Sequence, residues 1–217
     1  MDAESRRYEK AIAIAMQQLS QLYEKAVQDV GELNAQIFEV HKMMLEDGDY
    51  MDSVFNMIRS QKMNAEYAIA TTGDNFSKMF STMEDAYFQA RAADVKDITE
   101  RLLIILNGDK TSVASATEPM ILVADDLAPS ETIQMDKKNL LSFVTRQGSI
   151  SSHTAILART LGIPAIIHVD FQMDWDGKLA IVDGYTGTVI LEPDEEVLQN
   201  IRKKSDWKKR KKNCSFK

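Results

Sequence analysis

The distribution of proline constrains the fold of this sequence more than any other feature. The first proline is Pro119, so the first half of the chain contains none. Proline interrupts helices, and its absence over such a length favours long helices. Apolar residues recur there at alternating spacings of four and three, which places them on one face of a helix. This stripe consists of Ile12, Met16, Leu19, Tyr23, Ala26, Val30, Leu33 and Ile37. We expect a kink or break at Gly31.

Further helical segments follow within the same half. The pattern predicts helices over roughly 50–60, 64–80 and 84–107. Asn64 is a suitable N-cap, and Asn107 followed by Gly108 is a suitable stop. Amphipathic helices joined by short connections bury their apolar faces against one another. The sequence therefore predicts an antiparallel helical bundle over residues 1–112.

The period of the pattern changes in the second half. Short β-rich runs bounded by Gly, Pro and Asp occupy 120–126, 140–145, 164–169, 179–184 and 187–193. A helical pattern separates the second run from the third. Strands that alternate with helical segments are typical of a compact α/β domain. The fold class is thus α and β in two parts. The second part covers residues 113–200, and a linker rich in small and polar residues at 111–119 spans its start.

Charge is distributed unevenly along the chain. The net charge of −7 is the sum of +8 in residues 202–217 and −15 elsewhere. We interpret residues 201–217 as a solvated, disordered basic tail, with contact to nucleic acid or anionic lipid as the alternative. The acidic body argues against a nucleic-acid partner and favours a basic one.

Membrane and secretion signals are not found in the sequence. No apolar run approaches the roughly 20 residues of a membrane-spanning helix, and the N-terminal MDAESRRYEK lacks a signal-peptide core. The single cysteine, Cys214, excludes an internal disulfide framework. We expect a cytoplasmic protein without a membrane partner.

His153 occupies an unusual position, between hydroxylated residues and a short helical run. The helical run continues to Leu161, where Gly162 ends it. A helix N-terminus attracts anions and disfavours imidazolium, so a histidine there keeps a nucleophilic nitrogen. The sequence predicts that His153 accepts a phosphoryl group. The side chains that can orient its ring or contact the phosphoryl oxygens are Ser151, Ser152 and Thr154. The alternative is a surface or capping histidine.

The stretch GSISSHTAILARTLGIPA, which begins at Gly148, resembles the phosphohistidine signature of the phosphoenolpyruvate-utilising enzymes. Residues 183–193 resemble the strand, turn and strand that follow it in that family. Within the family, residues 37–47, 90–103 and 121–132 resemble the amino-terminal half of Enzyme I of the bacterial sugar phosphotransferase system. Pyruvate phosphate dikinase and phosphoenolpyruvate synthase share the signature but not this helical insert.

The resemblance implies an enzyme that moves a phosphoryl group from phosphoenolpyruvate to the carrier protein HPr. By this resemblance His153 carries the group as a phosphohistidine of a swivelling α/β domain. The helical part would dock HPr through the segment around His41. The docking residues implied are Met43, Met44, Glu46, Asp47, Asp49 and Arg91. We do not expect His41 itself to be catalytic.

The resemblance also bears on cofactors. In the family, phosphoenolpyruvate and Mg²⁺ bind a carboxyl-terminal barrel that has no counterpart in these residues. We therefore expect no cofactor or metal bound by this chain, and only phosphate exchange between His153 and HPr. The oligomeric state stays open.

Three positions depart from the family pattern. Ser149 replaces a glycine, Ala128 replaces a frequent threonine, and His168 stands where glycine is usual. These departures motivate a second reading, a degenerate paralogue that binds a carrier without catalysis. Two further readings are a domain of a dikinase or synthase relative, and a helical assembly module.

Overall fold

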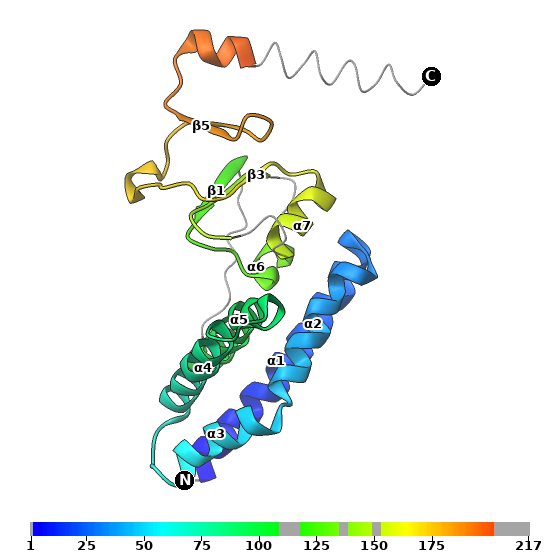
Figure 1. The fold of residues 1–217 in the computed structure, drawn as a ribbon, viewed down its shortest axis with the longest axis vertical. Coiled ribbons are helices and arrows are strands. Elements are labelled where there is room, and N and C mark those ends of the chain that lie inside the picture. Colours follow the sequence, from blue (N-terminus) through cyan, green and yellow to red (C-terminus); the bar gives the residue numbers. More distant parts are fainter. Residues whose placement is uncertain (1, 109–117, 135–138, 149–152, 202–217) are drawn as a thin grey trace.

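The computed structural model describes residues 2–108, 118–134, 139–148 and 153–201. Within these ranges the chain forms a helical part followed by an α/β part, as expected from the change in sequence period (Figure 1). The expected boundary at residue 112 and the expected tail at 201–217 fall on or beyond the edges of the described residues. No helix in the described ranges is long and apolar enough to cross a membrane.

Five helices build the first part, and their bounds are α1 (Asp2–Val30), α2 (Glu32–Leu45), α3 (Gly48–Arg59), α4 (Ala65–Ser81) and α5 (Ala86–Asn107). The expected break at Gly31 is confirmed, and its φ of 87° is one that glycine adopts without strain. The expected cap at Asn64 is confirmed as well, since its side chain accepts a hydrogen bond from the backbone N–H of Tyr67 at 3.1 Å. Gly108 ends α5 in the left-handed conformation.

The apolar stripe lines the bundle core along α1. The prediction that it continues into α2 was wrong at one position. Leu19, Ala26 and Ile37 are buried, whereas Leu33 is 80% exposed. The chain turns at Gly31, so the helical phase of α1 does not carry over into α2. Burial in α2 follows a new phase through Phe38 and Leu45.

The closest packing in the bundle joins α4 to α5. A Cβ built on Gly73 would lie 2.3 Å from Oγ1 of Thr99. That hydroxyl donates to the carbonyl oxygen of Val95 at 2.7 Å and lies 3.2 Å from the Tyr50 hydroxyl. Thr99 therefore cannot rotate away without losing hydrogen bonds in a buried position.

The α/β part contains a parallel sheet and a separate hairpin. Strands β1 (Met120–Ala124), β2 (Leu140–Thr145) and β3 (Ala165–Ile166) are parallel and lie in sequential order. Strands β4 (Ala180–Asp183) and β5 (Thr188–Leu191) form an antiparallel pair. The remaining elements are α6 (Pro129–Gln134), α7 (His153–Leu161), the 3₁₀ turn Met173–Trp175 and a helical segment at 195–201. Every expected strand is confirmed, and α6 was not predicted.

The sheet order determines which side α6 and α7 occupy. Crossovers between parallel strands are right-handed, so strands in sequential order carry both helices on the same face. Figure 1 shows α6 and α7 between the strands and the helical part. The α/β core is small and consists of Leu127, Leu140, Phe143 and Ala158. The sheet consequently reaches the bundle through these two helices.

We predict that Gly73→Ala lowers the free energy of unfolding by about 1–3 kcal/mol, because the new methyl overpacks against Thr99. Urea denaturation of the 217-residue chain measures this. Gly48→Ala is the matched control, since a Cβ there meets no atom within 4 Å. A Gly73→Ala chain as stable as the Gly48→Ala chain would contradict the packing described.

Candidate functional site

His153 is the first residue of α7, as the sequence predicted. The first turn of a helix has backbone N–H groups without intrahelical partners, and these favour an anion. Ser151 and Ser152 lie outside the described residues, and so do the side chains of His153 and Thr154. What the structure supplies is therefore the backbone of the site and its surroundings.

The far end of α7 fixes the direction of the helix. Gly162 has a φ of 67°, its N–H donates to Arg159 at 3.1 Å, and the N–H of Ile163 donates to Ala158 at 2.9 Å. These two bonds form a Schellman cap. Ala158 is 1% exposed, and Ile163 packs against the same core. The cap and this burial hold the axis of α7, and with it the place of its N-terminus.

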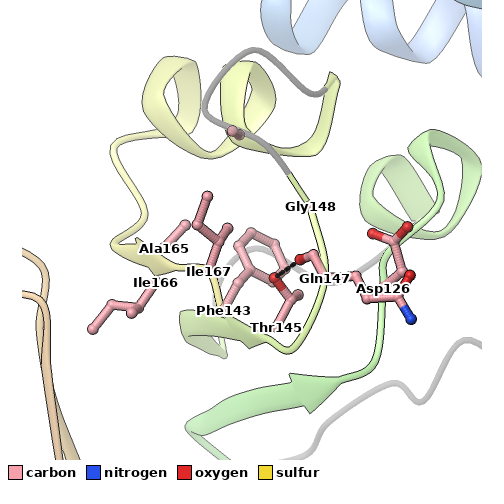
Figure 2. Close-up of a pocket in the computed structure, with 9 residues that line it drawn as sticks. Asp126, Phe143, Thr145, Gln147, Gly148, Ala165, Ile166 and Ile167 are labelled. Atoms are coloured by element: carbon pink, nitrogen blue, oxygen red, sulfur yellow. Dashed lines mark hydrogen bonds between the residues drawn. The ribbon is translucent and has the colours of Figure 1, made fainter. Parts of the chain in front are cut away.

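A small pocket lies at the carboxyl ends of the parallel strands, beside the first turn of α7 (Figure 2). Ligands of parallel α/β sheets bind at this edge. The lining residues are Asp126, Phe143, Thr145, Gln147, Gly148, Ala155, Ala165, Ile166 and Ile167. The floor is apolar, and Asp126, Thr145 and Gln147 supply polar groups.

The turn that leads toward His153 is fixed by two residues. Thr145 is 5% exposed, and its hydroxyl donates to the carbonyl oxygen of Gln147 at 2.7 Å (Figure 2). Gly148 follows with a φ of 119°, which side chains disfavour. The chain thus leaves β2 in a defined direction. Ser149, the first departure from the family pattern, lies outside the described residues.

Arg146 contacts residues outside the pocket and links the segments around it. Its guanidinium pairs with Asp125, donates to the carbonyl oxygen of Phe171 at 2.7 Å and lies 4.3 Å from the centre of the Phe171 ring. Arg146 therefore joins the ends of β1 and β2 to the segment after β3. Sequence reasoning missed it, because its partners are distant in sequence and nothing local indicated a role.

The other two departures from the family pattern, Ala128 and His168, lie in different structural settings. Ala128 precedes α6 at the N-cap position, and its N–H donates to Oε2 of Glu131 at 2.9 Å. This is half of a capping box, since alanine has no oxygen to return the bond. His168 is exposed and has a φ of 61°. That conformation costs a residue with a side chain about 1–2 kcal/mol.

The segment implied as a docking surface lies where α2 meets α3. Met43 is 69% exposed, and Met44 packs against the bundle core. Glu46, Asp47 and Asp49 are exposed. Asp47 also caps α3 by accepting a hydrogen bond from the N–H of Tyr50 at 3.0 Å.

Arg91 lies on α5 and is joined to this region through Asp94. Its guanidinium donates to Asp94 at 2.8 Å and to the Tyr87 hydroxyl at 2.7 Å. The other oxygen of Asp94 lies 3.4 Å from Nε2 of the buried His41. Burial would raise the pKa of the Asp94 carboxyl, but His41 and Arg91 outweigh it and lower that pKa. The structure thus brings Arg91 and His41 to one carboxylate.

No group of three or more His, Cys, Asp or Glu residues is arranged for a metal ion in the part of the chain that the structure describes.

We predict that Ala128→Thr raises the free energy of unfolding by about 1 kcal/mol, because it completes the capping box of α6. Thermal or urea unfolding checks this. Ala128→Val is the matched control, with the same shape and no hydroxyl. Equal stability of the two variants would show that the missing hydroxyl does not limit α6.

Comparisons with known proteins match both parts of the chain. Residues 1–91 match the family described as "PEP-utilising enzyme, N-terminal", and residues 116–187 match "PEP-utilising enzyme, mobile domain".

Curated relatives extend this match over nearly the whole sequence. Phosphoenolpyruvate-protein phosphotransferase of Lactococcus lactis subsp. cremoris is 42% identical over 94% of this chain and 36% of its own length. The protein of the same name from Listeria innocua is 38% identical over 95% of this chain and 37% of its own length. The chain thus spans little more than a third of the length of these relatives.

Solved structures agree with the fold. The solution structure of the protein titled Enzyme I (nEIt) matches with a TM-score of 0.73 and 31% identity, over 96% of this chain and 85% of that one. The structure titled "N-terminal domain of Enzyme 1 - Nitrogen" matches with a TM-score of 0.60 and 27% identity, over 94% and 84%. With both parts matched in order, the chain belongs to the phosphoenolpyruvate-utilising enzymes, and within them to the amino-terminal region of Enzyme I.

Proposed function

We propose that this chain is the part of a phosphoenolpyruvate-protein phosphotransferase that carries the phosphohistidine and docks HPr in bacterial sugar uptake. The observation that carries the proposal is His153 at the first residue of α7, beside a pocket at the carboxyl edge of a parallel sheet. The family assignment supports His153 as the residue that carries the phosphoryl group. The proposal includes a cytoplasmic location.

The proposed step is a direct phosphoryl transfer between two imidazoles. An unprotonated ring nitrogen of His153 attacks the phosphorus of phosphorylated HPr in line. The new N–P bond forms as the N–P bond on the HPr histidine breaks, and that histidine keeps the electron pair. The reverse step returns the group to HPr. The rate of such a transfer depends mainly on how the two imidazoles are positioned and on how the charge of the phosphoryl group is stabilised.

The chain supplies that stabilisation at the start of α7. Free backbone N–H groups of the first turn attract the phosphoryl oxygens, and the positive end of the helix disfavours protonation of the attacking ring. We propose that Ser151, Ser152 and Thr154 orient the ring or donate hydrogen bonds to the phosphoryl oxygens.

The proposed docking surface combines apolar and acidic groups. Met43 offers an exposed flexible side chain with Met44 beside it, and Glu46, Asp47 and Asp49 surround the end of α2 with negative charge. This suits a carrier with an apolar centre and a basic rim. Arg91 would contribute at the edge while it remains paired with Asp94.

Residues 1–217 are proposed to exchange phosphate with HPr without phosphoenolpyruvate. In this proposal phosphoenolpyruvate and Mg²⁺ act on a region of the family that lies outside this sequence, and the chain itself binds no cofactor.

We predict that HPr carrying a ³²P phosphoryl group labels the wild-type chain and does not label His153→Ala. The label should be acid-labile, as a phosphohistidine is. His168→Ala serves as the control, because it removes a histidine outside the pocket and should keep the label. Incubation with labelled phosphoenolpyruvate and Mg²⁺, without HPr, should leave the isolated chain unlabelled.

Two outcomes would contradict the proposal. Label on His153→Ala would place the phosphoryl group elsewhere. An unlabelled wild type that still binds HPr would support the second candidate, a carrier-binding protein without transfer. That candidate is favoured by Ala128, which lacks the hydroxyl frequent in the family at the start of α6.

A further inference from the structure

Asp97 of α5 joins three elements through its two carboxylate oxygens. One oxygen accepts a hydrogen bond from the hydroxyl of Ser130, on α6, at 2.8 Å. The other lies 3.5 Å from Nδ1 of His41, on α2. Asp97 is 8% exposed and Ser130 is 3% exposed. The α/β part is therefore held on the helical part by a buried, charge-assisted hydrogen bond, which is about twice as strong as a neutral one.

The imidazole of His41 lies between the Ser130–Asp97 hydrogen bond and the proposed docking surface. It is fully buried, with Asp97 near one nitrogen and Asp94 at 3.4 Å from the other. Asp94 in turn receives the guanidinium of Arg91. Ser130, Asp97, His41, Asp94 and Arg91 thus form one continuous polar chain from α6 to the edge of α5.

Helix α6 belongs to both parts of the molecule. Ile133, near the end of α6, is fully buried in the bundle core. Leu127, which precedes the first residue of α6, is buried in the α/β core. The helix also contacts α1 of the helical part and α7 of the α/β part. The apolar contacts are not directional, since burial is rewarded in any orientation that keeps water out. The Ser130 hydrogen bond is directional and fixes how α6 sits on the bundle.

We propose that Ser130 and Asp97 are positioning residues for the transfer. Their hydrogen bond sets the orientation of α6 and, through α7, the position of the His153 backbone relative to a carrier docked where α2 meets α3. This inference rests on the proposed function for the transfer itself, but not for the orientation. The hydrogen bond contributes to the rate within the complex and not to carrier affinity, because neither residue lies on the exposed edge.

The test replaces the donor and the acceptor separately and together. Ser130→Ala removes the donor, and Asp97→Leu removes the acceptor while it keeps the branched shape of the side chain. We expect each variant to bind unphosphorylated HPr within twofold of the wild type in calorimetry. Single-turnover transfer from saturating phosphorylated HPr should fall at least tenfold. The double variant should be no slower than the slower single variant, because both remove the same bond.

Ser130→Thr provides the matched control, since it keeps the hydroxyl and should transfer within threefold of the wild type. An equal loss of HPr affinity and transfer rate in Ser130→Ala would overturn the inference, because Ser130 would then be a docking residue. Independent losses that multiply in the double variant would overturn it as well.

A second measurement keeps the inference separate from the proposed function. Residual dipolar couplings of the amide groups report the orientation of the α/β part relative to the helices without any transfer. Ser130→Ala should change that orientation, and Ser130→Thr should not. An unchanged orientation would overturn the inference. A changed orientation together with a wild type that accepts no phosphate would support the role of the hydrogen bond in orienting the two parts and would contradict the proposed function.

Discussion

The burial of Ile133 in the bundle core is the contact on which the arrangement of the molecule depends. Ile133 belongs to α6, which lies in the α/β part of the sequence, yet it is fully buried among side chains of the helical part. Because the strands are parallel and sequential, the crossover helices α6 and α7 share one face of the sheet. Anchoring α6 therefore brings α7 to the bundle as well, where α7 contacts α1 and α2. The N-terminus of α7, with His153, is placed by this chain of contacts.

The interior of the helical part contains several ionisable side chains. His41, Asp94, Asp97 and Arg101 are all nearly or fully buried. Buried ionic groups lose hydration, and an apolar replacement is often as stable. Burial lowers the pKa of the Arg101 guanidinium despite the charge of Asp97, which indicates how costly this environment is for a cation. In the inference above, the directional hydrogen bond between Ser130 and Asp97 is what these buried groups contribute to the orientation of α6.

The sequence predicted those parts of the fold whose signal is local. Helices and strands of the two halves followed from their periods, and α7 followed from a short helical run that Gly162 ends. The six residues of α6 are too few for a period, and its N-cap is Ala128 rather than a residue with a capping oxygen. The polar chain between the helical part and the α/β part was not predictable. His41, Asp97 and Ser130 are far apart in sequence and meet only after the helices pack.

The central claim is that His153, alone among the three histidines, carries the phosphoryl group. The most direct measurement is ¹⁵N NMR of the chain labelled at histidine, before and after reaction with phosphorylated HPr. We predict that one imidazole nitrogen of His153 gains a coupling to phosphorus, while His41 and His168 do not. A phosphorus coupling at His41 or His168, or none in a chain that has taken the phosphate from HPr, would contradict the account.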